Sequence, residues 1–513
     1  MHVLYWCLSR YSDFLVTHSQ PFAAVHTRFR MTVPLSRLAP QTLSTQLAER
    51  LGERIRMRLL PAGARLPSVR ECARQQGVST HTVVAAYDLL QAQGLVEARP
   101  QSGFFVRDFV QDAPLLQPEQ ARAVPAEEAP GVPKGTRINA SMLVRGMFHQ
   151  SVGGRPQPGA GVLPAEWLEA GFLAAAMRKA CSGKSLHDSC VGYGDPLGDI
   201  GLREALSRRL ARLGIAAAPQ HIITTMGATH GLDVVSRALL QPGDPVMVEE
   251  PGWAVEFARL ASLGMRVLPV PRGPDGPDLA VMQRYCESCA PKLYVSVSVL
   301  HNPTGYSLSP ASAHEVLQLA RRFGFYVVED DTYGEIAPDH AARMTVLDRL
   351  SHSIYVSGFA KLLAPNWRVG YLAPPPALVE RLVDTKLLST LTTPSLMERA
   401  LAHCMDQGQL RRHAERLRQH LAQARMRSVA LAQQAGARFA AEPAGMFGWV
   451  DTGVDTETLA QRLLDAGYFI APGAMFHAGR QPSTCMRINF ATTQEPAFWR
   501  IFEREVQAMR GSA

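Results

Sequence analysis

Residues 325–333, FYVVEDDTY, decide the fold of most of this chain. The apolar start of the stretch predicts a buried strand of a parallel sheet, and its acidic end predicts the loop that follows. A second strand pattern at 353–357 runs into residues 358–361, GFAK. Because ligands bind at the carboxyl ends of strands in open α/β sheets, we expect Asp330 and Lys361 on the same edge of one sheet.

A lysine and a carboxylate on one sheet edge are what a pyridoxal phosphate site needs. The lysine amine can bind the aldehyde of this cofactor covalently, and a carboxylate keeps the pyridine nitrogen protonated so that the ring accepts electrons. Either residue taken alone is more often an ordinary surface side chain. Further polar groups at other strand ends are therefore needed before Asp330 and Lys361 can be assigned to a cofactor site.

Helix and strand patterns alternate from about residue 150 to the end, which predicts an α/β fold with a mostly parallel sheet covered by helices. Helices are expected at 166–180 and 199–213, and further strands at 221–225, 245–249 and 292–300. Long helices around 396–433 and 456–466, with strands near 447–450 and 486–490, predict a smaller α+β lobe that falls mainly within 380–513.

Composition narrows the class of protein. The 513 residues suggest about three domains, and 46% hydrophobic with 19% charged residues is typical of a globular chain. Residues 40–107 hold nine Arg, no Lys and five acidic residues within a net charge of +8, which suits a nucleic-acid partner. The scattered 8 Cys and the lack of any apolar run near ~18 residues favour a cytoplasmic protein that is not in a membrane.

A single C-x-x-C, Cys286 and Cys289, is a weak zinc signal without a second pair, so we expect two thiols on a helix and no metal site. Residues 1–34 show no periodicity and are interpreted as a poorly ordered extension, within which Met31 could be the true start. Residues 108–149 are rich in Pro, Ala, Gln and Glu, which predicts a linker that lets two folded units move.

Residues 35–107 carry the pattern of a winged helix-turn-helix, an α+β fold. Leu43, Leu47, Leu51 and Ile55 recur every four residues on a first helix over 41–60. Ser68 and Glu71 form a predicted capping box for a second helix, and Ser79 caps a third that runs to about residue 93. Strand patterns at 95–99 and 104–106 with a turn between them complete the wing.

This region resembles the GntR family of transcription regulators. The resemblance rests on LPSVRE at 66–71, VSTHTV at 78–83, Tyr87, Leu90, Gly94 with Leu95, and Gly103. It implies that operator DNA is contacted by Arg70, by the start of the recognition helix and by the wing tip; the residues concerned are Arg70, Ser79, Thr80, His81, Thr82 and Gly103. Members of the family often carry a basic residue where Thr80 stands. A winged domain that binds protein instead of DNA is the alternative.

Residues 150–513 resemble a fold-type-I, class I aminotransferase, and a GntR head on such a body resembles the MocR subfamily of bacterial regulators. The resemblance rests on the groups that follow the strands, namely GAT at 227–229, PGW at 251–253, HNPTG at 301–305, Asp330, Tyr333, Lys361, Arg368 and Arg487. It implies that the cofactor is bound by Lys361, Asp330, Asn302, Tyr333, Trp253, Ala228, Thr229 and Arg368, with Tyr193 reaching the phosphate in the neighbouring subunit of a homodimer. It also implies that Arg487 binds the carboxylate of an amino-acid or amine ligand.

Two positions depart from that family. Members usually have Ser three residues before the lysine, whereas this chain has Gly358 there and Ser357 one residue earlier, so Ser357 is the candidate phosphate ligand. Trp253 stands where Tyr or Phe is common. We expect a regulator that uses pyridoxal phosphate and an amino compound as effector; the alternatives are a working aminotransferase and a large domain that serves only as a dimer scaffold.

Overall fold

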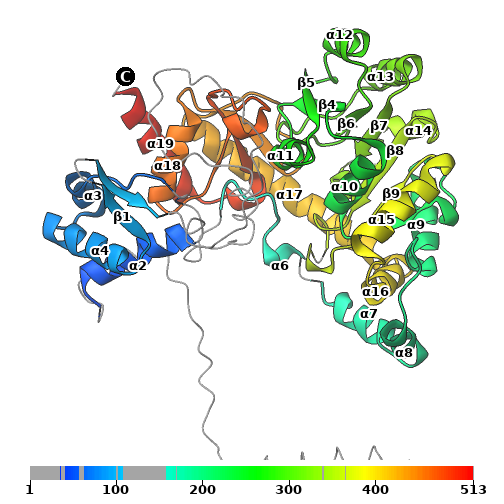
Figure 1. Cartoon of the computed structure of the whole chain (residues 1–513), viewed down its shortest axis with the longest axis horizontal. Coiled ribbons are helices and arrows are strands. Elements are labelled where there is room, and N and C mark those ends of the chain that lie inside the picture. The colour runs from blue at the N-terminus through cyan, green and yellow to red at the C-terminus, as the bar shows by residue number, and fades with distance from the viewer. Residues whose placement is uncertain are drawn as a thin grey trace, which may run out of the picture.

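The computed structural model describes residues 41–56, 63–99, 102–107, 157–168, 170–337, 340–363 and 365–511, together with Leu35 and Leu60. The predicted extension (1–34) and the predicted linker (108–149) lie outside the described residues. The described residues form a winged head (41–107), a large lobe built on a seven-stranded sheet, and a small lobe built on a four-stranded sheet (Figure 1).

The winged head has the predicted order of elements. It consists of α2 (Leu43–Arg56), α3 (Val69–Gln76), α4 (Thr80–Ala92), β1 (Val96–Arg99) and β2 (Gly103–Val106). The hydroxyls of Ser68 and Ser79 accept hydrogen bonds from the third residues of α3 and α4, so both predicted caps are confirmed. The predicted return contact of Glu71 is wrong, because its carboxylate instead accepts a hydrogen bond from Gln75 one helical turn on.

The sheet of the large lobe is mixed rather than wholly parallel. Its strand order is β3-β9-β8-β7-β6-β4-β5, and β9 runs antiparallel to both of its neighbours. The strands are β3 (Ile223–Thr225), β4 (Pro245–Glu250), β5 (Arg266–Pro271), β6 (Leu293–Ser296), β7 (Tyr326–Asp330), β8 (Ser353–Gly358) and β9 (Gly370–Ala373). Parallel pairing of β7 with β8 places Asp330 opposite Val356, so Asp330 at the end of β7 is next to the strand that Lys361 follows.

Helices cover both faces of this sheet. One face packs against α10 (Ala228–Leu239), α11 (Ala254–Ser262) and α15 (Val379–Thr390), and the other against α12 (Leu279–Cys289) and α13 (Pro310–Phe323). Further helices of this lobe are α8 (Lys184–Val191), α9 (Ile200–Arg212), α14 (Met344–Asp348) and α16 (Ser395–Asp406). The last of these, α16, packs on α7 (Phe172–Ala180) and α9, and α15 packs on α10, so the core of the small lobe begins later than residue 380.

One predicted helix and one predicted strand differ in their bounds from the elements in the structure. The helix expected at 166–180 is divided into α6 (Ala165–Leu168) and α7 (Phe172–Ala180), with Gly171 at the start of α7, and glycine is a poor residue for a helix interior. The strand expected at 292–300 ends at Ser296. The next amide, of Val297, donates to the buried side-chain carboxylate of Glu249 on the neighbouring strand β4, and not to a backbone carbonyl of that strand.

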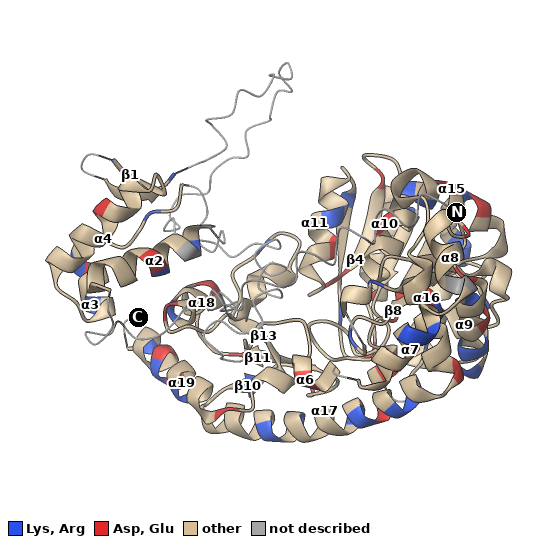
Figure 2. Ribbon diagram, turned by 90° about the horizontal axis from the view of Figure 1, so that it is seen from below, with Lys and Arg blue, Asp and Glu red and all other residues tan. Residues whose placement is uncertain are grey.

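The small lobe is an antiparallel sheet that packs against helices. Its strand order is β10-β11-β13-β12, with β10 (Arg438–Phe439), β11 (Phe447–Asp451), β12 (Ala471–Pro472) and β13 (Cys485–Asn489). Its core contains residues from α18 (Thr456–Asp465) and α19 (Pro496–Arg510). The 26-residue helix α17 (Gln409–Gln434) joins the lobes: Leu410, Leu417 and Leu421 lie in the large-lobe core, and Ala432 in the small-lobe core (Figure 2).

The winged head contacts the small lobe. The Nη1 atom of Arg54 on α2 lies 3.0 Å from the carboxylate of Asp465, the last residue of α18, and the Arg54 side chain is 12% exposed. The search for a long apolar helix that could cross a membrane finds no candidate in the described part of the chain.

Candidate cofactor and DNA-binding sites

One cavity in the large lobe brings together most of the predicted cofactor residues. It has a volume of about 140 Å³ and opens at the carboxyl ends of β7 and β8. Its lining includes Ala228, Thr229, Trp253, Asn302, Asp330, Tyr333, Lys361, Arg368 and Arg487. These residues come from six separate segments of the chain, so the fold, and not proximity in sequence, creates the cavity.

Lys361 and Asp330 are buried ionisable groups within this cavity. The pKa of Lys361 is lowered to about 8, chiefly by burial and also by the positive charges of Arg487 and Arg368, against the opposing effect of Asp330. The Nζ atom of Lys361 donates a 2.6 Å hydrogen bond to the carbonyl oxygen of Gly161. Burial also raises the pKa of Asp330 to about 6, although hydrogen bonds from Thr332 oppose this rise.

Asn302, Tyr333 and Arg487 form a connected group in the same cavity. The Asn302 side chain donates to the Tyr333 hydroxyl at 3.2 Å, and Arg487 Nη1 donates to the Asn302 side-chain oxygen at 3.0 Å. The Arg487 guanidinium lies over the rings of Phe447 and Phe476, at 4.4 and 5.2 Å. Burial lowers its pKa to about 10, and its Nε has no hydrogen-bond partner among the described residues.

The start of α10 forms the anion-binding end of the cavity. Gly227 precedes the helix with φ +80, and no side chain caps the first turn, so backbone N–H groups remain for an anion. Arg368 lies beside this turn and donates a 3.0 Å hydrogen bond to the carbonyl oxygen of Met226. A Cβ on Gly227 would lie 2.7 Å from the Arg368 guanidinium, and the positive φ of this residue also favours glycine.

The donor set fits pyridoxal phosphate. A buried amine of lowered pKa, a carboxyl group, the half-buried Trp253 ring and an uncapped helix start lie around one cavity. These groups match the aldehyde, the pyridine nitrogen, the flat ring and the phosphate of that cofactor. The search for a cluster of three or more His, Cys, Asp or Glu that could hold a metal finds none among the residues that the structure describes.

Two predicted cofactor residues lie outside the cavity lining. Ser357 is buried within β8, and its hydroxyl donates to the carbonyl oxygen of Asp331, so its side chain bonds to the neighbouring strand. Gly358 lines the cavity in its place. The Tyr193 side chain is 83% exposed and does not line this cavity.

Two glycines at or beside the cavity, Gly161 and Gly159, were missed by the sequence predictions. Gly161 accepts the Lys361 hydrogen bond, and the nearby Gly159 carbonyl accepts one from Arg487 Nη2 at 2.7 Å. A Cβ on Gly159 would lie 2.5 Å from the backbone of Ile470, so this residue has to be glycine. The glycine-rich sequence PGAG at 158–161 could have indicated a segment whose backbone makes close contacts.

Most of the candidate DNA-binding residues of the winged head are exposed. Arg70 at the start of α3 and Ser79, Thr80 and His81 at the start of α4 are exposed, whereas Thr82 is half-buried. The hydroxyls of Ser79 and Thr82 lie 2.8 Å apart, and Ser79 also caps α4, so these two side chains are held in place by the helix start. Gly103 has φ +103 at the beginning of β2 and lies against the side chain of Arg65.

Comparison with known proteins agrees with both halves of this architecture. Residues 161–501 match the family described as aminotransferase class I and II, and residues 43–106 match the bacterial regulatory proteins of the gntR family. The HTH-type transcriptional regulator YdcR of Escherichia coli K12, which is described as uncharacterized, is 29% identical over 91% of this chain and 97% of its own length. The probable rhizopine catabolism regulatory protein MocR of Rhizobium meliloti is 29% identical over 78% of this chain and 79% of its own length.

A solved structure shows the likeness of the large body alone. The α-aminoadipate aminotransferase LysN of Thermus thermophilus, complexed with N-(5'-phosphopyridoxyl)-L-leucine, matches with a TM-score of 0.64 at 23% identity. The match covers 69% of this chain and 92% of LysN. Fold and site thus define a winged helix-turn-helix head on an aminotransferase-like body. The chain belongs to the aminotransferase class I and II family, and it is a GntR-type regulator fused to that domain, in the arrangement of the MocR-type regulators.

Proposed function

We propose that this protein binds operator DNA through its winged head and that an amino acid or amine, bound with pyridoxal phosphate in the large body, controls that binding. One observation carries the proposal: Lys361, Asp330, Asn302 and Arg487 line a single cavity in a chain that also has a helix-turn-helix head. A body that served only as a dimer scaffold would not need this set. The proposal places the protein in the cytoplasm with its DNA.

Each group of the cavity has a distinct task in ligand binding. Pyridoxal phosphate, when bound, supplies an aldehyde for covalent attachment and a ring that accepts electrons. Lys361 provides the amine, Asp330 the partner for the ring nitrogen, and Arg368 with the start of α10 the phosphate contacts. Arg487 provides a planar pair of donors for the carboxylate of an effector. The single network from Asn302 to Arg487 would orient ring and effector together.

The small lobe offers a route from the effector to the head. Arg487 lies on β13 of the small lobe, and the same lobe carries Asp465, which contacts Arg54 of the head. Closure of one lobe on another is a common two-state element, and a ligand shifts it through its different affinity for the two states. Because the spacing of DNA half-sites is a strict geometric demand, a movement of the heads would alter operator affinity.

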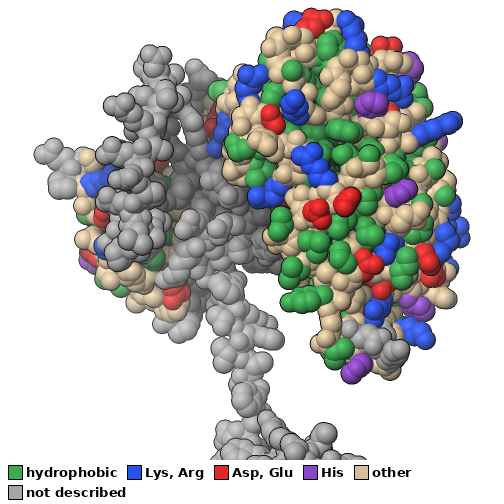
Figure 3. Space-filling model, turned by 45° about the vertical axis from the view of Figure 1, so that its right-hand side comes forward, with side chains coloured by type: hydrophobic (Ala, Val, Ile, Leu, Met, Phe, Trp, Pro, Cys, Tyr) green, Lys and Arg blue, Asp and Glu red, His purple; other side chains and the backbone are tan. Residues whose placement is uncertain are grey.

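We also propose a homodimer formed by the large lobe. Several large apolar side chains are exposed around the end of α8 and the end of α15, namely Leu186, Val191, Tyr193, Ile200, Leu388 and Leu391. The backbone next to Tyr193 lies against Thr392 and Thr393, so Tyr193 and Leu391 belong to one surface. On the face of the molecule drawn in Figure 3, exposed hydrophobic side chains lie among charged ones. An exposed apolar area of this kind is typical of a protein interface.

The second candidate function is that of an aminotransferase. The observation in its favour is the same cavity, which holds a buried amine of lowered pKa beside a carboxylate clamp. A regulator and an aminotransferase would both need these groups, so the residues of the cavity do not distinguish between the two functions. The winged head, which matches the family of bacterial regulators, favours the regulator.

The test measures DNA binding and turnover on the same holoprotein. Fluorescence anisotropy with a DNA fragment from upstream of its own gene should change when one of a panel of amino acids and amines is added. Arg487→Ala should remove this response and leave the cofactor absorbance unchanged, whereas Arg500→Ala, at an exposed arginine of α19, should keep both. Transamination at ordinary enzyme rates of ~1–10³ per second, with no effect on DNA binding, would replace the regulator with the aminotransferase.

A further inference from the structure

One end of α17 is bonded to the segment that carries Lys361. His413 lies on the second turn of α17 and is 2% exposed. Its Nε2 atom lies 2.9 Å from the carbonyl oxygen of Leu362, the residue that follows Lys361. Because Leu362 is 1% exposed, loss of this hydrogen bond would leave its carbonyl oxygen away from water, which costs free energy.

The contacts of His413 fix the state of its ring. The guanidinium of Arg416, which can only donate, has its Nη2 atom 3.3 Å from Nδ1 of His413. Nδ1 therefore accepts, and the single proton of the neutral ring lies on Nε2, which donates to Leu362. Burial lowers the pKa of His413, against the opposing effect of the hydrogen bond to Leu362, so the neutral ring is favoured. The ring also packs edge-on against Phe172 of α7, with 5.9 Å between the ring centres.

The same helix is bonded to the segment that carries Tyr333. The Nε atom of Arg418 donates a 3.0 Å hydrogen bond to the carbonyl oxygen of Glu335. Glu335 lies in the short helix η3 (Gly334–Ile336), which directly follows Tyr333. Because five residues turn an α-helix by about 140°, Arg418 and His413 point to different sides of α17. One helix thus bonds to the segments that follow two neighbouring strands, β7 and β8.

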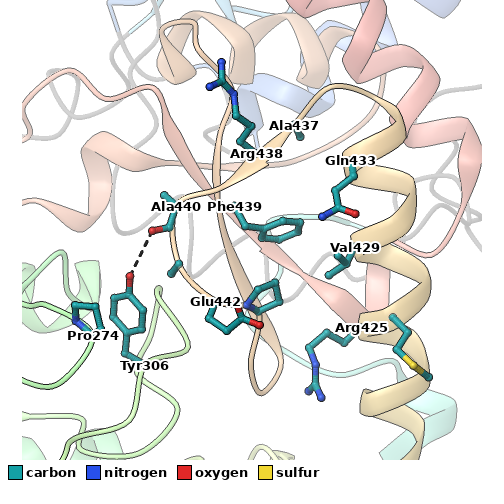
Figure 4. Close-up of a pocket in the computed structure, with 13 residues that line it drawn as sticks. Pro274, Tyr306, Arg425, Val429, Gln433, Ala437, Arg438, Phe439, Ala440 and Glu442 are labelled. Carbon is teal, nitrogen blue, oxygen red and sulfur yellow. Dashed lines mark hydrogen bonds between the residues drawn. The ribbon is translucent and has the colours of Figure 1, made fainter.

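The far half of α17 is bonded to the small lobe. The hydroxyl of Ser428, which is fully buried, lies 2.6 Å from that of Thr493. Thr493 in turn donates to the end of β13, the strand that carries Arg487. Figure 4 shows Val429 of α17 beside the Phe439 ring of β10, and both side chains pack on the small-lobe core. A displacement of α17 in the large lobe would therefore be passed to the lobe that bears the proposed clamp.

We infer that His413 and Arg418 are positioning residues of the cofactor site, which couple the segments carrying Lys361 and Tyr333 to α17 and through it to the small lobe. Neither side chain lines the cavity, so both act through the backbone that they hold. Hydrogen bonds and rigid helices with defined contacts are what carries energetic coupling between distant sites. The inference rests on the proposed binding of pyridoxal phosphate and makes no use of the effector or of DNA.

The test is hydrogen exchange, measured by mass spectrometry on the full-length protein without and with pyridoxal phosphate. In the wild type, the cofactor should change the exchange of the amides of residues 409–421 in α17. His413→Phe keeps a ring beside Phe172 but has no donor, so this response should be lost and the cofactor dissociation constant should rise by about tenfold. Arg418→Met should likewise weaken the response. His413→Gln, whose side-chain nitrogen can take the place of Nε2, should restore it.

The matched control is His420→Phe, the same substitution at an exposed histidine of α17 whose ring contacts Trp167. It should keep both the exchange response and the cofactor affinity. Melting temperature, measured on every variant, shows that the protein is folded, and the use of two positions, His413 and Arg418, guards against one variant that does not fold.

The inference is overturned if α17 of the wild type does not respond to bound cofactor, or if both His413→Phe and Arg418→Met respond as His420→Phe does. It is also overturned if His413→Gln behaves like His413→Phe, because the hydrogen bond would then not be the cause. A wild-type protein that takes up no cofactor would overturn the proposed function itself, and the inference with it.

Discussion

Arg487 of the small lobe donates a 3.0 Å hydrogen bond to the side-chain oxygen of Asn302 in the large lobe. The predicted carboxylate clamp is thus held across the two lobes by a neutral amide. Because the amide carries no charge, it can hold the guanidinium in place and still leave its positive charge for an effector. A substitution at Asn302 should therefore block carboxylate binding by Arg487 without removing the arginine itself.

Asn302→Asp should turn the clamp into a buried ion pair. A carboxylate at this position would compete with the effector carboxylate, so effector affinity should fall by about tenfold or more, since hydrogen bonds between charged groups are worth ~1.5–3 kcal/mol. The measurement is a titration of cofactor absorbance with the amino acid that alters DNA binding. Equal affinity in the wild type and the variant would show that Arg487 is not the carboxylate site.

Lys361→Ala should abolish covalent cofactor binding. The wild-type protein with pyridoxal phosphate should absorb at the edge of the visible range, and borohydride should fix the label on Lys361. The variant should lose the band and melt no earlier, because a buried lysine of lowered pKa is not a stabilising charge. Lys179→Ala, at an exposed lysine of α7, is the control and should keep the label. A label that stays in the Lys361→Ala protein would contradict the assignment.

The rate of cofactor attachment should depend on pH through the Lys361 amine. Only the neutral amine attacks an aldehyde, and its pKa is lowered to about 8. The rate should therefore increase about tenfold per pH unit below pH ~7 and become constant above pH ~9, whereas an ordinary lysine, of pKa ~10.4, would show a rise that continues to pH ~10. Stopped-flow absorbance of the apoprotein mixed with pyridoxal phosphate measures this directly. A rise that extends to pH ~10 would mean that the amine is not perturbed.

Arg70→Ala should weaken operator binding. If the guanidinium reads a guanine, the loss should be about 1–3 kcal/mol and confined to particular sequences. If it contacts phosphate, affinity should fall for all sequences and the salt dependence should decrease by about one unit. Anisotropy titrations at several salt concentrations distinguish the two results. The control is Arg237→Ala, an exposed arginine on α10 of the large lobe; an Arg70 variant that behaves like it would remove Arg70 from the DNA interface.

Leu388→Arg should weaken the proposed homodimer. Leu388 is 92% exposed in the single chain, and burial of a leucine side chain in an interface is worth about 1.5–3 kcal/mol. A charged replacement should thus raise the dimer dissociation constant by at least about tenfold, as measured by sedimentation velocity over a range of concentrations. Leu347→Arg, at a 48% exposed leucine of α14, should leave assembly unchanged. Dimers of equal strength in both variants would place the interface elsewhere.

The sequence predicted those features that depend on local patterns. The strands that end at Asp330 and just before Lys361, and the caps at Ser68 and Ser79, follow from apolar runs and capping chemistry, which act over a few residues. These signals were enough to predict the winged head and the pair Asp330 and Lys361, whereas the other residues of the cavity were named from the resemblance to class I aminotransferases.

Features that depend on distant partners could not be predicted in this way. The Ser357 hydroxyl bonds to the backbone of Asp331 because β8 pairs with β7, and nothing near Ser357 in the sequence indicates this. The roles of Gly159 and Gly161 depend on Arg487 and Lys361, which lie 328 and 200 residues away in the sequence. The early end of β6 likewise depends on Glu249 from another strand.

The helix α17 has a mechanical consequence for signalling. Its 26 residues correspond to a rod about 39 Å long, and its two halves are anchored in the cores of different lobes. A rod fixed in this way acts as a lever: a tilt of only about 5° at its large-lobe end displaces its far end by about 3 Å, comparable to one residue of strand. In the proposed dimer, a small rotation of α17 on effector binding would thus become a displacement large enough to change the distance between the two winged heads.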